Sequence, residues 1–289
     1  MAVLLGAGIW ASAGFAKPHE RHASGTVSVL YAGSLVDTME RQIGPAFSKA
    51  TGYGYQGFGA GSKAVASQIK GKLRRGDVFI SASPGVNTTL MGSAKGNWVP
   101  WYGAFATSPL VIGYSTSSRF ASAFRTRPWW KVMQSSGFLL GRTDPAIDPK
   151  GQLTVSFLHR VEVAKHLPGL SRTILGDAEN TSQIFPEETL LGRLQAGQLD
   201  AGFFYSIEAR AAHIPTVNPP LGTHYSARYT VTILNGAPNA PGALAFVKYL
   251  LGPQGTALLK ADGFQFVKNQ IGGDKTAVPA EVKSQLTTG

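Results

Sequence analysis

The sequence predicts an α/β protein of two compact lobes, whose sheets are covered by helices. Three observations lead to this prediction. The chain has 289 residues, which is more than a single hydrophobic core usually fills. Hydrophobic residues make up 43% of it and charged residues only 15%, which is the composition of a folded chain with ample apolar surface to bury. Strand–turn–helix units also follow one another along its first part, as in α/β folds.

The first part of the chain predicts a parallel sheet flanked by helices. Its elements are, in order, a strand at 27–31, a helix at 36–51, a second strand and its turn within 53–62, a helix at 63–72, a third strand at 77–81 and a third helix that carries Leu90. Consecutive units of this kind place their strands side by side and parallel. Ligands of such sheets bind beyond the carboxyl ends of the strands.

The second part continues with strands and helices of less regular order. We expect strands at 105–114, 138–142, 199–206 and 229–233, and helices at 153–166, 187–196, 241–251 and 253–261. Gly197 is expected to close the helix at 187–196. Between the strand at 138–142 and the next helix lies a segment with two Asp-Pro pairs, Asp144-Pro145 and Asp148-Pro149.

The amino-terminal residues predict export. Residues 1–16 form an apolar run with small residues near its end, and a polar stretch follows, as in the back half of a secretory signal. The alternative is a short membrane anchor, but the run is well below the roughly 20 apolar residues that a span needs. We therefore expect 1–24 to be a signal remnant and tail, and the mature protein to be soluble and periplasmic.

Cysteine and charge exclude several classes of protein. The chain has no cysteine, which excludes disulfides, thiolate metal sites and a lipid-modified cysteine. Its net charge is +11, but the basic residues are scattered apart from the cluster at 70–75, and they form no nucleic-acid-binding pattern. We therefore expect a generally cationic surface and no nucleic-acid partner.

Two serines predict an anion site. Ser34 and Ser62 each lie in a glycine-containing turn between a strand and a helix, where unpaired backbone N–H groups and the helix dipole favour an anion. The alternative is that both are ordinary helix N-caps. The glycine-rich run at 57–63 fits neither the P-loop nor a dinucleotide fingerprint, and the chain has no Gly-x-Ser-x-Gly elbow or metalloprotease motif. We expect no enzyme activity and no cofactor.

The chain carries a series of motifs in a fixed order. They are Ala32-Gly33-Ser34-Leu35, Gly61-Ser62, Gly76-Asp77-Val78, the segment 105–112, Asp144-Pro145-x-x-Asp148-Pro149-x-Gly151, Gly197-x-x-Asp200 with Tyr205-Ser206, and the tail 232–240. In these motifs the chain resembles the molybdate/tungstate-binding family of periplasmic solute-binding proteins, particularly its archaeal-type branch. The resemblance runs from about Thr26 to Phe266, and the paired Asp-Pro segment is its most specific part.

The resemblance implies a type II periplasmic-binding-protein fold with two crossover strands, near 105–110 and 225–230. Lobe I would then comprise 25–107 and 228–289, and lobe II 108–227, each with a mixed, mostly parallel sheet. It also implies a monomeric receptor that delivers molybdate or tungstate to the permease of an ABC transporter. The implied ligand-binding residues are Ser34, Ser62, Asp148, Glu187 and Tyr205.

Asp148 and Glu187, or Glu188 in its place, would coordinate the Mo or W atom itself. Carboxylates repel an oxyanion unless they bond to its metal, which Mo and W allow by expanding toward six-coordination. Sulfate and phosphate cannot expand, so the same carboxylates would reject them. The alternatives are a helix N-cap for Asp148 and a favourable first-turn charge for either glutamate. Hydroxyl and N–H donors would then hold the anion in tetrahedral form.

Lys150 and Gln152 depart from the usual residues of that branch, which leaves the choice of anion open. Sulfate or ferric ion is the alternative solute, although ferric binders usually present adjacent tyrosines and Tyr205 is followed by Ser206. A secreted hydrolase that uses Asp148 and a glutamate as an acid/base pair is the alternative from another class.

Overall fold

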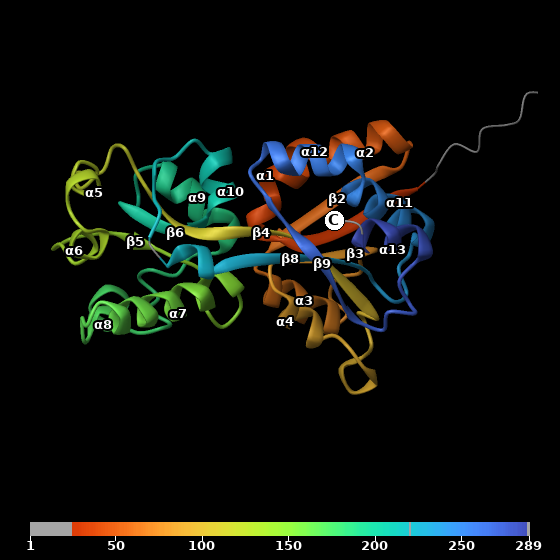
Figure 1. The fold of residues 1–289 in the computed structure, drawn as a ribbon, viewed down its shortest axis with the longest axis horizontal. Helices are drawn as coiled ribbons and strands as arrows, with labels where there is room; N and C mark the ends of the chain where they lie inside the picture. Colours follow the sequence, from red (N-terminus) through yellow and green to blue (C-terminus); the bar gives the residue numbers. More distant parts are fainter. Residues whose placement is uncertain (1–24, 220, 288–289) are drawn as a thin grey trace, which may run out of the picture.

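The computed structural model describes residues 25–219 and 221–287, and the signal predicted at 1–24 lies outside them. Figure 1 shows two lobes side by side, joined by long strands that run between them. Each lobe has strands in its middle and helices on both sides, so the predicted two-lobed α/β fold is confirmed. Within the described residues, no helix combines the length and apolar character needed to cross a membrane.

The strands form one continuous mixed sheet. Along the described chain they are β1 Thr26–Ala32, β2 Gly54–Ala60, β3 Val78–Ser81, β4 Trp101–Tyr114, β5 Leu140–Gly141, β6 Ala201–Tyr205, β7 Thr216–Val217, β8 Ser226–Ile233 and β9 Gln265–Gly273. Their spatial order is β2-β1-β3-β8-β4-β6-β5, with β7 and β9 also paired to β4. β1 is parallel to β2 and β3, and β5 is parallel to β6.

Strand β4 connects the lobes. It is 14 residues long; its first part pairs antiparallel with β8 and β9, and its last part pairs with β6 and β7. The sequence predicts a mostly parallel sheet in each lobe. The observed sheet is more antiparallel, because β6, β7, β8 and β9 all run antiparallel to β4. The predicted lobe boundaries fall within β4 and near the start of β8, and they stay a prediction.

Helices cover both faces of each lobe. In lobe I they are α1 Val36–Thr38, α2 Gly44–Thr51, α3 Ser62–Lys70, α4 Pro84–Thr88, α11 Ala240–Leu251, α12 Pro253–Ala261 and α13 Ala280–Thr287. In lobe II they are α5 Ala123–Thr126, α6 Trp129–Met133, α7 Pro149–Ala164, α8 Leu170–Leu175, α9 Glu187–Gln195 and α10 Ser206–Ala211. Figure 1 shows α3 and α4 on the face of lobe I opposite α2 and α12, and α7 and α8 opposite α9 and α10 in lobe II.

The apolar core follows the sheet from one lobe into the other. Its largest cluster includes Val29 and Ile80 of lobe I, Ile112 of β4 and Phe203 of lobe II. Separate clusters lie under α3 and α4 and under α9. The continuous core fixes the two halves of β4 and thereby holds the turns at the lobe junction in place.

Most predicted elements are confirmed, and the exceptions have identifiable causes. The helix predicted from residue 153 begins at Pro149, because Asp148 caps it and proline is well tolerated in the first turn. The sequence analysis did not identify β9 and β7, which pair with the first and last parts of β4. The helix predicted to carry Leu90 is shorter than expected, because α4 ends at Thr88 and Leu90 follows it in a turn. The sequence analysis also did not identify five short or terminal helices (α5, α6, α8, α10 and α13), which have weak or brief apolar periodicity.

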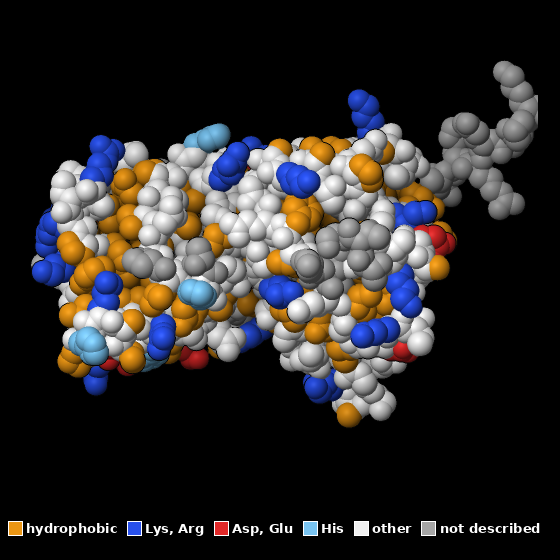
Figure 2. Space-filling model, in the orientation of Figure 1, with side chains coloured by type: hydrophobic (Ala, Val, Ile, Leu, Met, Phe, Trp, Pro, Cys, Tyr) orange, Lys and Arg blue, Asp and Glu red, His pale blue; other side chains and the backbone are white. Residues whose placement is uncertain are grey.

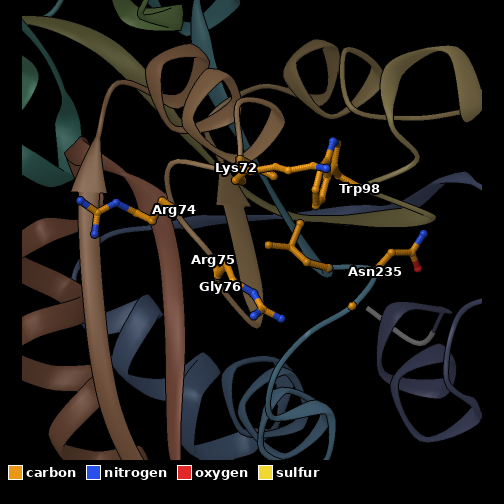
Figure 3. A pocket seen from close by; sticks show the side chains of 9 residues that line it. Lys72, Arg74, Arg75, Gly76, Trp98 and Asn235 are labelled. Atoms are coloured by element: carbon orange, nitrogen blue, oxygen red, sulfur yellow. The ribbon is translucent and has the colours of Figure 1, made fainter.

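Basic side chains are spread over the surface. Figure 2 shows Lys and Arg in separate spots over one whole face, rather than in a single stripe. The cluster at 70–75 borders a hollow of about 390 Å³, and Figure 3 shows Lys72, Arg74, Arg75 and Trp98 around it. These cations are exposed, and Arg74 lies 3.5 Å over the Phe58 ring. The hollow is on lobe I, lined by Gly76 just before β3, at the end of the sheet opposite the turns with Ser34 and Ser62.

Candidate functional site

The site begins with two turns of lobe I. Ser34 lies in the 3-10 turn Gly33–Leu35 directly after β1, and Ser62 is the first residue of α3, after β2. Because β1 and β2 are parallel, with Ala32 opposite Ala60, both turns lie at the same edge of the sheet. Both serines are buried. The prediction that these two turns converge is therefore supported by their place in the fold.

The two serines are not helix N-caps. Ala32 and Gly61 occupy the cap positions, and the serine hydroxyls bond elsewhere. Ser34 Oγ lies 2.9 Å from the Tyr229 hydroxyl, and Ser62 Oγ accepts a 3.0 Å hydrogen bond from the Ala82 backbone N–H. The alternative role that the sequence left open for them is wrong, and the Ser62 hydroxyl proton stays free to be donated to a ligand.

Asp148 serves two purposes with its two oxygens. It is the N-cap of α7, where Oδ1 accepts from Lys150 N at 2.6 Å, Gly151 N at 3.4 Å and Thr143 Oγ1 at 3.0 Å. Oδ2 is buried and has no hydrogen-bond partner among the described residues. The cap interpretation is thus confirmed for one oxygen, while the other remains available for a ligand.

Glu187 and Glu188 both lie in the first turn of α9, but only Glu187 is buried. Glu187 is 6% exposed, whereas Glu188 faces solvent. Burial raises the pKa of Glu187 well above its usual range, the charge of Asp148 raises it further, and Lys150 opposes the rise. The pair of buried acids at the lobe junction is therefore Asp148 and Glu187.

Glycines bring lobe I against these acids. A Cβ atom placed on Gly61 would lie 2.9 Å from Asp148 Oδ2 and from the Ile147 carbonyl oxygen, and one on Gly33 would lie 3.1 Å from Glu187 Oε2. Two hydrogen bonds join the same surfaces: Ala64 N to Ile147 O at 3.2 Å, and Lys63 Nζ to Pro145 O at 3.0 Å. The lobes are in contact here, and only residues without a side chain allow the approach.

Lys150 is the site residue whose role the sequence did not indicate. Its side chain is 1% exposed, and its Nζ lies 2.8 and 2.9 Å from the two Glu208 oxygens and 3.2 Å from Glu187 Oε1. Burial alone would lower the pKa of Lys150, but the charges of Glu208, Glu187 and Asp148 outweigh it and raise the pKa. Its place directly after an Asp-Pro cap was visible in the sequence, but its burial and partners depend on α9 and α10.

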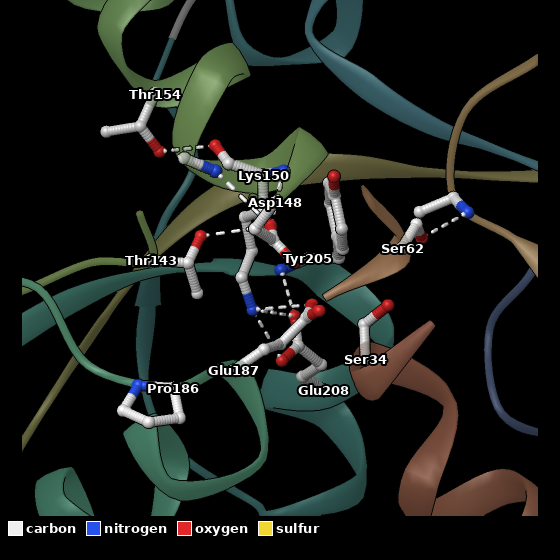
Figure 4. Close-up of polar contacts among 12 residues, drawn as sticks. Ser34, Ser62, Thr143, Asp148, Lys150, Thr154, Pro186, Glu187, Tyr205 and Glu208 are labelled. Carbon is white, nitrogen blue, oxygen red and sulfur yellow. Dashed lines mark hydrogen bonds and ion pairs between the residues drawn. The ribbon is translucent and has the colours of Figure 1, made fainter. Parts of the chain in front are cut away.

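Figure 4 shows how the side chains converge. Tyr205, at the end of β6, is fully buried, and among the described residues its hydroxyl has no hydrogen-bond partner. Burial raises the pKa of Tyr205, and the Asp148 charge adds to the rise, so the phenol keeps its proton and acts as a donor. Glu187 Oε1 also has no hydrogen-bond partner in the described chain, because its 3.2 Å ion pair with Lys150 does not have hydrogen-bond geometry.

The arrangement offers two kinds of contact to one small ligand. Ser62 and Tyr205 supply hydroxyl donors, which suit the oxygens of an anion. Asp148 and Glu187 supply carboxylate oxygens, which suit an electrophilic metal atom. A groove of about 290 Å³ is lined by Gly33, Ser34, Glu187 and Glu208 among others, so it reaches the Glu187 side of this arrangement.

Sequence comparison identifies relatives of known class. The profile of the bacterial extracellular solute-binding protein family matches residues 27–265. An uncharacterised solute-binding protein of Petrotoga mobilis is 28% identical, over 92% of this chain and 91% of that protein. A putative ABC transporter molybdenum-binding protein of Haloferax volcanii is 29% identical, over 81% of this chain and 68% of that protein. A molybdate/tungstate-binding protein of Thermococcus kodakarensis is 23% identical, over 91% and 89%.

Solved structures share the fold. The periplasmic molybdate-binding protein of Azotobacter vinelandii superposes with a TM-score of 0.62 and 21% identity, over 82% of this chain and 98% of that one. The periplasmic binding protein AfuA of Actinobacillus pleuropneumoniae, with fructose-6-phosphate bound, superposes with a TM-score of 0.63 and 13% identity. The superposition covers 91% of this chain and 94% of that one. These similarities confirm the predicted two-lobed type II periplasmic-binding-protein fold.

Proposed function

This chain belongs to the bacterial extracellular solute-binding protein family, and we propose that it captures molybdate or tungstate between its lobes for an ATP-driven importer. Membership in the family makes it a solute receptor rather than an enzyme. Export to the periplasm, action as a soluble monomer and delivery to an ABC transporter permease are parts of the same proposal.

One observation carries the choice of ligand. Two buried carboxylates, on Asp148 and Glu187, direct oxygens without hydrogen-bond partners in the described chain into the same junction as the Ser62 and Tyr205 hydroxyls. Carboxylates alone would repel an oxyanion, and hydroxyls alone would not distinguish molybdate from sulfate. Together they suit a tetrahedral oxyanion whose central atom accepts two further ligands, as Mo and W do and S and P do not.

The comparisons support the same ligand class. Relatives from Haloferax and Thermococcus are named for molybdenum or for molybdate and tungstate, and the Azotobacter structure with the same fold is a molybdate-binding protein. Ferric ion suits the site less well, because Ser206 follows Tyr205 where adjacent tyrosines would be expected. Sulfate would face two carboxylates that it cannot use.

A titration of the purified protein tests the proposal. Thermal shift and calorimetry would compare molybdate, tungstate, sulfate, phosphate and ferric citrate. A ligand at a hundred times its Kd adds roughly 2.7 kcal/mol to the free energy of unfolding, which raises Tm by several degrees. We expect stabilisation by molybdate and tungstate and none by sulfate. A response to sulfate alone or to ferric citrate alone would keep the fold and contradict the proposed ligand.

A further inference from the structure

We infer that Lys150 is a positioning residue: its ammonium, held by Glu208, fixes Glu187 opposite Asp148 and thereby selects the oxyanion that the site accepts. The inference rests on the proposed function and adds to it the residue that makes a cluster of acids able to receive an anion.

Lys150 contacts both candidate ligand residues. Its backbone N–H donates to Asp148 Oδ1 at 2.6 Å, and its Nζ lies 3.2 Å from Glu187 Oε1. The first contact occupies the Asp148 oxygen that caps α7, so Oδ2 is the oxygen left for the ligand. The second contact links α7 to the first turn of α9. One residue therefore sets the relative position of the two carboxylates.

Glu208 supports Lys150 and is not a ligand. Both of its oxygens bond to Lys150 Nζ, at 2.8 and 2.9 Å, and Oε2 also accepts from Tyr205 N at 2.7 Å. An ammonium group has three donors. Two of them bond to Glu208, and Glu187 Oε1, 3.2 Å from the nitrogen, is held by charge attraction rather than by a hydrogen bond. Glu208 of α10 thus orients the Lys150 ammonium, and the ammonium attracts Glu187 of α9.

The charges explain why a lysine is needed here. Asp148, Glu187 and Glu208 lie together in a buried region, and Lys150 is the cation that pairs with two of them. Without it, three buried acids would face a dianion with no cation among them, and each one that is ionised would repel the dianion strongly at low dielectric. Lys150 and Glu208 together form a neutral pair. Removing both therefore leaves the charge of the site unchanged and removes only the support for Glu187.

The variants Lys150→Met, Glu208→Gln and Lys150→Met/Glu208→Gln separate these effects, with Lys70→Met as a control that removes an exposed positive charge at the end of α3. Calorimetry would give the Kd of sodium molybdate and of sodium sulfate for each full-length protein. X-ray absorption at the Mo K-edge would give the coordination number of bound molybdate, which a merely structural residue would not change.

We expect Lys150→Met to weaken molybdate binding on the order of 100-fold, as for other buried charge pairs that lose one partner. The double variant should recover part of this loss but remain about 10-fold weaker than wild type, with a lower Mo coordination number. Glu208→Gln should fall between wild type and the double variant, and Lys70→Met should match wild type.

Equal Kd and equal coordination number in wild type and in Lys150→Met would overturn the inference. If Lys150→Met does not fold, the double variant decides, since it also neutralises Glu208, the main partner that Lys150→Met alone would leave unpaired. Wild-type affinity and coordination number in the double variant would likewise overturn the inference. A wild-type protein that binds no molybdate at all would instead contradict the proposed function, before any variant is compared.

Discussion

The two walls of the site differ in chemistry. Lobe I contributes Gly33, Ser34, Gly61 and Ser62, which are uncharged and small, whereas lobe II contributes Asp148, Lys150, Glu187 and Glu208. We therefore propose that the charged wall determines which anion binds and that the neutral wall allows the lobes to close. The difference indicates that changes in lobe II should alter which anion binds, and changes in lobe I should alter how firmly the lobes close over it.

The charged wall is stabilised by its own helices. Asp148 caps α7, and Glu187 and Glu208 lie in the first turns of α9 and α10. The amino-terminal end of a helix favours a negative charge, so each helix dipole offsets part of the cost of burying the acid that the helix carries. Lobe II can thus concentrate acids in a buried place with a single lysine among them.

The largest expected effect comes from breaking the charged wall at Asp148. Asp148→Ala should weaken molybdate binding on the order of 100-fold or more, about 2.7 kcal/mol, because the ligand oxygen is lost. It should also lower the free energy of unfolding by about 1 kcal/mol, since the α7 cap is lost as well. Calorimetry and thermal melts measure the two effects.

Asp148→Asn is the matched control for this change. Asparagine caps helices about as well as aspartate, so this variant should keep the stability of wild type and still lose affinity. If either variant binds molybdate as tightly as wild type, Asp148 is a cap only, and direct coordination is wrong.

Gly61→Ala tests the neutral wall. The added methyl group would lie 2.9 Å from Asp148 Oδ2 and from Ile147 O, so the lobes could not approach as closely, and molybdate affinity should fall roughly 10-fold. Gly61 lies at the contact between the lobes rather than in the apolar core, so Tm without ligand should change little. Gly85→Ala in α4 is the control, because its nearest neighbour is Ser83 Oγ at 3.6 Å. Unchanged affinity for Gly61→Ala would mean that the close approach is unimportant.

The two walls also differ in how far the sequence predicts them. The neutral wall follows from local pattern: Gly33-Ser34 and Gly61-Ser62 end neighbouring parallel strands, and such strands end at one edge. The charged wall required the family resemblance, which suggested Asp148 and left Glu187 and Glu188 open. Only packing distinguishes the two glutamates, since both lie in one helical turn and burial depends on how α9 rests against lobe I.

The Lys150–Glu208 pair and strand β9 show the limit of sequence reasoning. Lys150 and Glu208 are 58 residues apart, and no local pattern relates two charges on different helices. A buried lysine also contradicts the usual expectation that lysines are exposed. Strand β9 has few apolar residues in alternation, and its identity comes from its pairing with β4. Local signals predict elements well, whereas long-range pairings need the fold.

Lys63→Met addresses the contact between the walls rather than either wall. The Lys63 ammonium donates to the Pro145 carbonyl at 3.0 Å across the lobe junction. Among the described residues, no hydrogen bond or ion pair joins it to the acids of lobe II. Loss of one partly exposed hydrogen bond of about 1 kcal/mol should speed molybdate release roughly 5-fold and leave selectivity over sulfate unchanged. Stopped-flow fluorescence measures the release rate, with Lys70→Met as control. A changed selectivity would place Lys63 in recognition instead.

Tyr205→Phe should have the smallest effect on molybdate affinity. It should also raise the stability of the ligand-free protein while it lowers the affinity, which distinguishes a ligand contact from a structural role. Without ligand, the buried hydroxyl lacks a hydrogen-bond partner among the described residues, so its removal should raise the free energy of unfolding by about 1 kcal/mol. With ligand, the same hydroxyl is expected to donate to an oxyanion oxygen, so molybdate affinity should fall a few-fold. Thermal melts without molybdate should therefore show a Tm above that of wild type, and the further rise in Tm on adding molybdate should be smaller than in wild type. Loss of stability in both states would instead show that the hydroxyl bonds to buried water and belongs to the framework of lobe II, not to the ligand contact.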